Sequence, residues 1–429
     1  MARLALVAVV ILLGFCAPVA AQVTAFVDGR IIDGTGRVIE RGTVIVRDGR
    51  IAEVGAAASV RVPDGATRVS LGGKTLMPGL VNAHGHLSPV EGLRTGAEFY
   101  TRANLERQLR AYATYGVTTV FSLGDDQADA FTLRAEQRTA APPRARVFVA
   151  GPIVNADTAD AARAATDKVI ALEPDLIKIR VDDNLGTGRK MPEVAWRATL
   201  VRAKAARLTL AAHVYYLADA KALAEAGNTF IAHSVRDLPV DDAFLAAMKR
   251  NNLCYSPTLM REVSTFVYDS TPPWASDPFF RRGYPAEISA ALADPGRQEK
   301  FKASPAYGQG QKYKGGLEVA KANLKRVSDA GIRVAFGTDT GPAARFQGFF
   351  EHLELEMMVA AGLTPMQALV SATGNAAACW GKQGQLGTIA PGAAADLLVL
   401  SANPLERIAN SRALDAIYIG GRRFDPPAP

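Results

Sequence analysis

The sequence predicts an α/β fold: a TIM (β/α)8 barrel with a small β-sandwich domain formed by both termini. Two observations predict this fold. Strand-like and helix-like segments alternate eight times in the middle of the chain, and two β-rich segments of similar character flank them. The 429 residues are enough for one large barrel with an accessory domain. A hydrophobic content of 48% indicates that the chain can build the deep core that this fold needs.

Residues 1–21 are typical of a signal peptide. A short basic start precedes an apolar run from Leu4 to Phe15, and small residues precede Gln22. The apolar run is too short to span a bilayer, so no stable membrane insertion is expected. The pattern predicts cleavage before Gln22 and a secreted or periplasmic protein. An uncleaved anchor and a lipid attached at Cys16 remain open as alternatives.

Residues 22–77 together with 384–429 are predicted to form the β-sandwich domain. Short runs rich in β-branched residues are separated by Asp-Gly and Thr-Gly turns, and the same style returns near the end of the chain. The predicted strands are Val23–Ile31, Gly42–Val46, Arg50–Val54, Asp396–Leu400 and Ala416–Arg423.

Residues 78–383 are predicted to form the barrel. Amphipathic segments such as Pro192–Ala206 and Asp242–Arg250 separate the strands and predict its helices. No glycine-rich phosphate loop follows the first strand, which argues against an open doubly wound sheet. The predicted strands are Leu76–Ala83, Val117–Leu123, Arg146–Ile153, Asp175–Val181, Leu208–Val214, Thr229–Ser234, Leu253–Leu259 and Arg333–Thr338.

A long link, residues 260–318, follows the seventh predicted strand. Links of this length are usually functional or disordered, and the many aromatic residues favour an ordered segment. We expect a lid over the barrel mouth, in which Trp274 and Tyr284 help to select the substrate. A surface excursion with its own small core is the alternative.

Four of the five histidines end predicted barrel strands, at the face where TIM barrels carry their active sites. His84 and His86 are two residues apart in a strand, so both imidazoles point the same way. His213 and His233 end the fifth and sixth strands. Imidazole is a common metal ligand, and four at three strand ends predict a metal site.

Asp339 and Lys178 extend this pattern. Asp339 ends the eighth strand, opposite the histidines, where it can bind a metal and shuttle protons. Burial lowers the pKa of a lysine inside a barrel, and the neutral amine of Lys178 can react with carbon dioxide to form a carbamate that bridges two metals. We therefore expect two divalent metal ions, with Zn²⁺ first and Co²⁺, Mn²⁺ or Fe²⁺ as alternatives.

With these motifs the chain resembles the amidohydrolase superfamily, in particular its imidazolonepropionase-like and metallo-dipeptidase (prolidase-like) group. The resemblance covers nearly the whole chain after residue 21 and rests on segments 77–86, 337–339, 361–365, 387–392 and 395–396.

The resemblance implies a role for each candidate ligand. His84 and His86 would bind the buried metal, and Lys178 would be a carbamylated bridge. The outer metal would be bound by His213 and His233, while Asp339 would complete the site and act as its catalytic acid–base group. Imidazolonepropionase lacks the strand-4 lysine, so Lys178 argues against that particular activity.

Three further residues are predicted to contact the substrate. Tyr215, two residues after His213, resembles a substrate-binding tyrosine of dipeptidase relatives, although core packing is an equal alternative. Arg180 and Arg236 follow ligand-bearing strands and could meet a carboxylate, or they could pair with nearby acids. We interpret His352 either as a residue that supports the metal ligands from behind or as a structural residue.

We therefore expect hydrolysis of an amide bond in a small substrate such as a dipeptide or N-acyl amino acid, by a metal-bridging hydroxide. The alternatives are a hydrolase of a cyclic amide, lactone or phosphotriester, and a non-catalytic periplasmic binding protein on the same scaffold. The net charge of +7 comes without a basic block, which argues against nucleic acid as a partner. Whether the protein is a homo-oligomer remains open.

Overall fold

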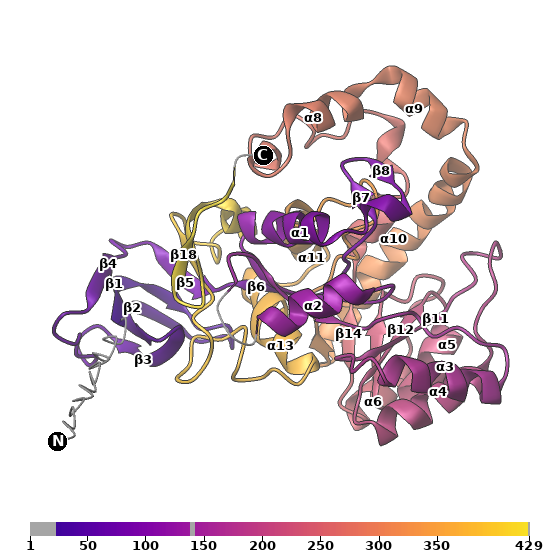
Figure 1. Cartoon of the computed structure of the whole chain (residues 1–429), viewed down its shortest axis with the longest axis horizontal. Helices are drawn as coiled ribbons and strands as arrows, with labels where there is room; N and C mark the ends of the chain where they lie inside the picture. Colours follow the sequence, from indigo (N-terminus) through magenta and orange to yellow (C-terminus); the bar gives the residue numbers. More distant parts are fainter. Residues whose placement is uncertain (1–22, 138–141, 428–429) are drawn as a thin grey trace, which may run out of the picture.

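The structure is a computed structural model that describes residues 23–137 and 142–427 (Figure 1). The predicted signal peptide and Cys16 lie outside the described residues. Within the described ranges, no helix has both the length and the apolar character needed to cross a membrane.

Eight parallel strands follow one another around the barrel in the predicted order. They form a three-stranded sheet, β10-β9-β6, and a five-stranded sheet, β11 to β15. Isolated bridges pair Gly85 with Thr340 and Val154 with Ile179, and so join the two sheets at both edges. The strands are β6 (Leu80–Gly85), β9 (Val117–Ser122), β10 (Arg146–Val149), β11 (Ile177–Val181), β12 (Leu210–Val214), β13 (Thr229–Ala232), β14 (Cys254–Ser256) and β15 (Arg333–Val334).

The first predicted barrel strand, Leu76–Ala83, is wrong in its bounds because two strands share it. β5 (Thr75–Pro78) belongs to the terminal β-sheet, whereas β6 begins the barrel after Gly79. A Cβ atom at Gly79 would lie 2.1 Å from Oγ1 of Thr118, so only glycine lets the chain pass between the two sheets here.

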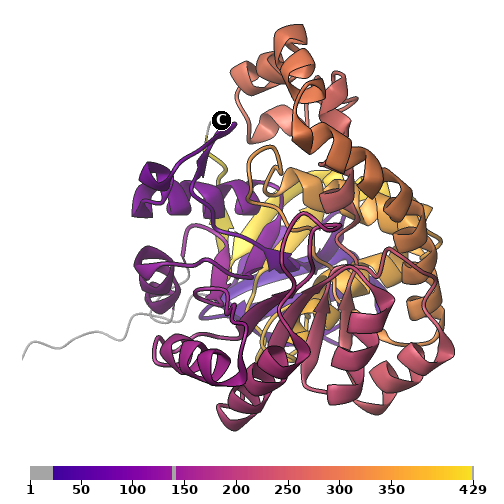
Figure 2. The same ribbon diagram turned by 90° about the vertical axis from the view of Figure 1, so that its right-hand side faces the viewer.

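Helices alternate with the barrel strands and cover their outer side (Figure 2). Thr101, Thr158 and Asp241 cap three of them, each accepting a hydrogen bond from a backbone N–H of the first turn. The helices are α1 (Arg102–Thr114), α2 (Ala128–Glu136), α3 (Ala159–Ile170), α4 (Glu193–Ala205), α5 (Leu217–Ala226), α6 (Asp242–Arg250), α11 (Phe349–Ala360), α12 (Pro365–Val370) and α13 (Ala376–Cys379).

The long link after β14 is helical rather than irregular. It contains α7 (Leu259–Val263), α8 (Ala286–Ala293), α9 (Pro295–Lys302) and α10 (Pro305–Asp329). Helices α8 and α9 and the start of α10 form an arch that stands away from the strands (Figures 1 and 2). The rest of α10 packs on the barrel through Leu317, Ala320 and Leu324. The first part of the link, from α7 to Leu292 of α8, packs in an apolar core together with aromatic residues from the start of α11 and the loop before it.

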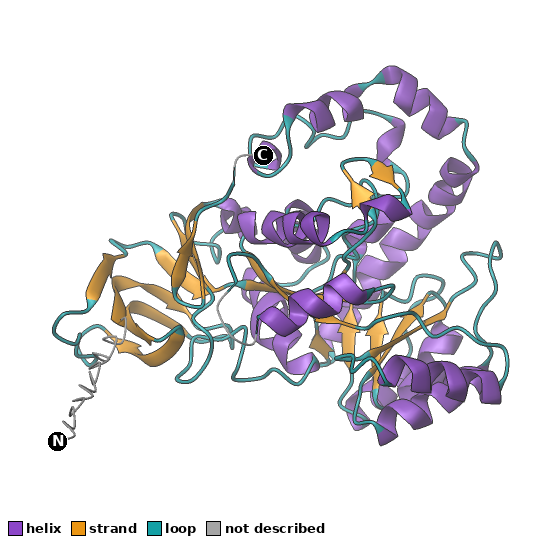
Figure 3. Ribbon diagram, in the orientation of Figure 1, coloured by secondary structure: helices purple, strands orange, loops and turns teal. Residues whose placement is uncertain are grey.

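Strands from both ends of the chain form one continuous sheet in the order β18-β17-β16-β5-β1-β2-β3, with β4 paired to β1 (Figure 3). The join between the two ends is the antiparallel pair of β5 and β16. The boundaries 22–77 and 384–429 stay a prediction. The strands are β1 (Val23–Ile32), β2 (Val38–Arg47), β3 (Arg50–Ala56), β4 (Thr67–Ser70), β16 (Leu397–Leu400), β17 (Leu414–Ile419) and β18 (Arg422–Phe424).

Cys254 and Cys379 form a disulfide that joins β14 to the end of α13. The two cysteines are 125 residues apart in sequence, and strand and helix packing bring their Cα atoms to 6.0 Å.

Candidate metal centre

His84, His86 and Asp339 form a compact cluster at the carboxyl end of the barrel strands. Their potential ligand atoms all lie within 4.8 Å of one another. One carboxylate oxygen of Asp339 lies 2.7 Å from Nε2 of His86 and 3.4 Å from Nε2 of His84. The backbone N–H of Asp339 also donates to the carbonyl of His84, so the segment that follows β15 is held directly against β6.

A buried network fixes the backbone on both sides of this cluster. Oδ1 of Asn82 accepts the N–H of His84, and its amide nitrogen donates to Glu351 over 2.6 Å. The hydroxyls of Thr338 and Thr340, on either side of Asp339, donate to the same carboxylate oxygen of Glu351. Glu351 therefore links the two strand ends that carry the cluster.

His213 and His233 lie beside the cluster, and their ring nitrogens are 3.0 Å apart. The other nitrogen of His213 lies 2.8 Å from Asp182, and that of His233 lies 2.6 Å from the hydroxyl of Thr258. The ring of His233 is also 4.5 Å from that of His84. Thus all four predicted histidines meet at one place, as the strand-end positions indicate.

Burial favours the neutral form of these imidazoles. It lowers the pKa of His213 to about 3, although Asp182 opposes the shift. Burial and nearby cationic groups also hold the pKa values of His84 and His233 well below the usual range. Neutral imidazole is the form that binds metals. His233 has a φ of 141°, a strained conformation of the kind that gathers at functional sites.

Lys178 lies at the base of the same site. Its side chain is 2% exposed, and among the described residues its Nζ has no hydrogen-bond partner. Desolvation lowers the pKa of Lys178 to about 7, although the charge of Asp339 opposes this shift. A buried amine with this pKa is partly neutral near pH 7 and can act as a nucleophile.

The cluster opens into a cavity of about 280 Å³. His84, His86, Lys178, His213 and Asp339 all line it, while the buried His233 lies behind them. Arginine side chains form much of the remaining polar wall. They are Arg180 from β11, Arg261 from α7 and Arg345 from the loop after β15.

The three arginines differ in what they already bind. Arg345 pairs with Asp339, and Arg261 pairs with Glu262. No ion pair to Arg180 occurs within the described part of the chain, and its side chain is exposed. Arg180 is therefore available to a substrate anion, and its contact with a substrate stays a prediction.

Tyr215 and Arg236 are positioned differently from the expectation. The guanidinium of Arg236 is buried, donates to Glu262 and the carbonyl of Val214, and lies 4.9 Å from the Tyr215 ring centre. Its acid partner is Glu262 and not its chain neighbour Asp237, because the α7 helix brings Glu262 underneath it. Neither Tyr215 nor Arg236 lines the cavity, and their substrate contacts stay predictions.

His352 is structural, one of the two roles expected from the sequence. Its Nε2 lies 2.8 Å from the carbonyl of Tyr115 and its Nδ1 lies 2.9 Å from the hydroxyl of Ser411. Because both ring nitrogens are satisfied away from the cavity, the side chain joins α11 to the segment before β17.

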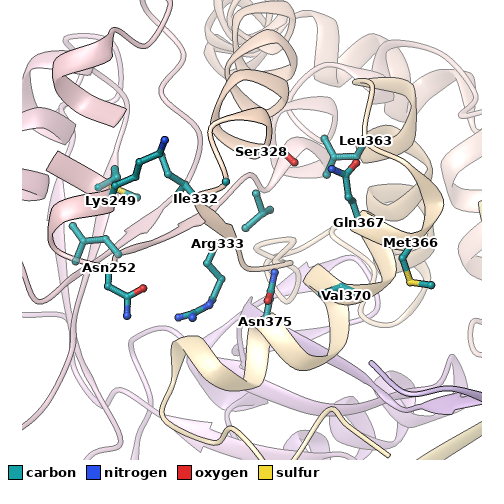
Figure 4. Close-up of a pocket in the computed structure, with 14 residues that line it drawn as sticks. Lys249, Asn252, Ser328, Ile332, Arg333, Leu363, Met366, Gln367, Val370 and Asn375 are labelled. Atoms are coloured by element: carbon teal, nitrogen blue, oxygen red, sulfur yellow. The ribbon is translucent and has the colours of Figure 1, made fainter. Parts of the chain in front are cut away.

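A different cavity, of about 450 Å³, lies at the opposite end of the barrel (Figure 4). Arg333 and Val334 at the start of β15 line it, together with Asn252 and Asn375. None of the predicted site residues is among its lining residues. In TIM barrels this face serves stability and the other face serves catalysis, so we assign the metal cavity as the site.

The residues at the site fit a divalent metal. Among the described side chains, both ring nitrogens of His84 and Nζ of Lys178 are buried without hydrogen-bond partners. Buried polar atoms without partners are costly, and a metal or bound substrate would satisfy them. The nitrogen and carboxylate donors present suit Zn²⁺ and related ions.

Comparison with known proteins identifies the family of this chain. Residues 75–424 match the amidohydrolase family. The chain belongs to the amidohydrolase family. It is therefore a hydrolase of carbon–nitrogen bonds, as the sequence predicts.

Individual relatives of this amidohydrolase are distant. The ochratoxinase of Aspergillus niger is 26% identical, and the alignment covers 95% of this chain and 88% of that protein. An imidazolonepropionase of Micrococcus luteus is 41% identical over only 20% of each chain. A solved Xaa-Pro dipeptidase with bound methionine shares the fold, with a TM-score of 0.75, 20% identity, and coverage of 94% of this chain and 100% of that one.

Proposed function

We propose that this amidohydrolase cleaves the amide bond of a dipeptide or N-acyl amino acid with the help of two divalent metal ions. The observation that carries the proposal is the cluster of His84, His86 and Asp339 at the base of a cavity whose wall includes Arg180, a cation with no ion-pair partner among the described residues. The cluster supports metal chemistry, and the arginine supports a substrate that has a carboxylate.

In this proposal His84, His86 and Asp339 hold one metal, and His213 and His233 hold the other. Lys178, as a carbamate, would supply oxygen donors to both ions. Bound at these donors, Zn²⁺ ions supply a Lewis acid for the scissile carbonyl and lower the pKa of water.

The chain's own side chains then orient the substrate and move the proton. Arg180 binds the substrate carboxylate through its guanidinium, a charge-assisted contact that fixes the amide relative to Asp339. Oδ2 of Asp339 faces Arg345, while Oδ1 faces the histidines. In the proposed reaction Asp339 accepts the proton of the attacking water and passes it to the leaving amine.

The relatives support the choice of substrate class. The solved Xaa-Pro dipeptidase acts on dipeptides by its name, and its likeness to this chain covers nearly all of both. The cavity of about 280 Å³ admits only a small group next to the metals, which fits an amino-acid moiety.

Metal reconstitution followed by a substrate screen tests the proposal. The apo-protein is loaded with Zn²⁺, Co²⁺ or Mn²⁺, the metal content is measured, and dipeptides and N-acyl amino acids are assayed beside lactones, cyclic amides and phosphotriesters. We expect two metal equivalents and turnover of the amides, both lost in His84→Ala. One equivalent under metal excess would refute the binuclear site. Turnover of only the other substrate classes would refute the amide assignment, and no turnover with metals bound would favour a binding protein.

We further propose that the protein is exported and matures by cleavage before Gln22. The disulfide of Cys254 and Cys379 supports this, because disulfides persist in oxidising compartments. N-terminal sequencing of protein expressed in a bacterial host should begin at or near Gln22. Soluble cytoplasmic protein that retains Met1 would contradict export.

A further inference from the structure

A second cavity adjoins the metal cavity, and the proposed function assigns no group of the substrate to it. Its volume is about 690 Å³, within the range of about 300–1,000 Å³ that is typical of small-molecule sites. Pro342 and Arg345 line both cavities, so the two spaces share a wall. We propose that this second cavity binds an apolar acyl group of the substrate, so that the enzyme prefers long-chain or aromatic N-acyl amino acids.

The walls of the second cavity are largely apolar. They come from α1, the hairpin of β7 (Val90–Glu91) and β8 (Arg94–Thr95), the segment leading into α8, and the loop after β15. The apolar contributions include Val90, Ala111, Tyr284, Ile288 and Phe346. Tyr284 of the long link thus lines the second cavity, whereas Trp274 is buried in the core that the link shares with α11.

The polar groups at the base of this cavity are already satisfied. Gln108 donates to the carbonyls of Ser88 and Val90 and accepts the N–H of Ser88. Gln347 donates to Gln108 and to the carbonyl of His86. The hydroxyl of Tyr284 donates to the carbonyl of Gln347.

Because these groups are engaged, a polar ligand would find few free partners inside, whereas an apolar group would lose no hydrogen bonds. Of the charged residues that line the cavity, Glu91, Arg107 and Arg110 are exposed, whereas Arg345 in the shared wall is paired with Asp339.

The positions of the two cavities suit the two halves of one substrate. Arg180 extends from the fourth barrel strand, β11, and the shared wall follows the eighth, β15, on the opposite side of the ring. A carboxylate held by Arg180 places the amino-acid half in the smaller cavity. The acyl half then points across the metal cluster toward Pro342 and into the apolar cavity. This assignment rests on the proposed function, because it takes the scissile amide to lie at the metals.

Filling the cavity tests the assignment. Ala111 is a half-buried residue of α1 that lines it, and Ala103 lines its exposed rim. Ala164 is exposed on α3, lines neither cavity and provides a matched control. We expect Ala111→Trp to raise KM for an N-decanoyl amino acid about tenfold more than KM for the N-acetyl analogue. Ala103→Trp should act in the same direction, and it covers the case in which Ala111→Trp does not fold. Ala164→Trp should leave the KM ratio unchanged.

Calorimetric titration with decanoate, the acid product, gives a readout that does not depend on turnover. Metal-loaded wild-type protein should bind decanoate more tightly than acetate, and Ala111→Trp or Ala103→Trp should remove that preference. Wild-type binding of decanoate no tighter than acetate would overturn the inference, as would equal effects of the folded tryptophan variants on both substrates. If no N-acyl amino acid is hydrolysed, the proposed function fails, while the titration still decides whether the cavity accepts an acyl chain.

Discussion

Lys178 is the residue whose surroundings are hardest to explain without a bound group. A buried ammonium ordinarily needs a carboxylate or several acceptors, yet none of the described residues accepts a hydrogen bond from it. Carbamylation would remove the cation and supply an anion between the proposed metal ligands.

We therefore predict that Lys178→Ala loses at least one metal equivalent and nearly all activity. The free energy of unfolding of the metal-free variant should not fall, because the substitution removes a buried cation without a partner. Elemental analysis and denaturant unfolding measure the two effects, and short carboxylic acids should partly restore metal binding. Lys190→Ala, which removes a lysine that pairs with Asp219 outside the cavity, serves as control. Full metal content in Lys178→Ala would show that the lysine is structural.

Arg180 is predicted to recognise the substrate carboxylate. Arg180→Met should raise KM about tenfold for substrates with a free α-carboxylate, because it removes one charge-assisted contact. It should change KM little for the corresponding carboxamides, which lack that charge. Arg189→Met, at an exposed arginine paired with Asp157, is the matched control. Equal effects on acid and amide substrates would assign Arg180 a different role.

At this scale the sequence predicts that the candidate ligands lie close together, but it does not identify two of the three arginines that line the metal cavity. The histidines and Asp339 are found because strand ends place them at one face whatever the details of packing. Arg261 and Arg345 lie in segments without strand or helix periodicity around them, so no pattern points them to the cavity. The pairing of Arg236 with Glu262 depends on the α7 helix, which lies in the long link where the sequence predicts a lid but no individual helices.

Among the elements, the long link after β14 differs most from the predicted lid. The aromatic content predicts a lid, and the structure places most of those rings in a core shared with α11. Trp274, for example, lies between Phe280 and Phe346 with ring centres at 5.1 and 5.4 Å. The aromatic residues that complete this core come from a distant part of the chain, so sequence alone cannot separate a lid from a self-contained excursion.

His352 joins α11 to the segment before β17, and its burial should make the stability of the fold decrease in acid. Burial lowers its pKa to about 3, although the carbonyl of Tyr115 opposes the shift, whereas an exposed histidine has its ordinary value of 6.5. Between these values the unfolded chain binds more protons, so the contribution to stability is complete above about pH 6.5 and declines as the pH falls toward 3.

His352→Gln can still donate to Tyr115 and accept from Ser411, and it does not titrate. We predict that, on going from about pH 7 to pH 5, the free energy of unfolding decreases less in His352→Gln than in the wild type. Denaturant unfolding of both metal-free proteins over this range measures the difference. Identical pH slopes would contradict the prediction.

For the whole molecule, the disulfide adds a constraint that the core does not provide. Cys254 and Cys379 close a long loop, and the loss of such a crosslink costs up to about 5 kcal/mol in the chain-entropy account. We predict that the double variant Cys254→Ala, Cys379→Ala unfolds at lower urea concentration than the wild type. Treatment of the unfolded wild type with a phosphine reductant before refolding should give the same midpoint as the double variant. An unchanged midpoint in both would show that the crosslink contributes no stability.

The overall architecture follows from periodicity, because eight alternating units and turn-rich ends leave few other arrangements. The helices Asp242–Arg250 and Glu193–Ala205 lie at, or within one residue of, the predicted bounds. Periodicity does not predict the disulfide or the division of one strand into two at Gly79, because both depend on contacts between segments that are distant in the sequence.

The pairing of β5 with β16 has a consequence for the order in which the protein can be completed. β5 ends at Pro78 and its neighbour in the sheet begins at Leu397, so more than three hundred intervening residues are synthesised before one edge of the early sheet is paired. Until then, the backbone groups of β5 on that side are open to strands of other molecules. A nascent chain with this topology therefore benefits from a holding chaperone, and loss of the last three strands would leave an association-prone edge on an otherwise complete barrel.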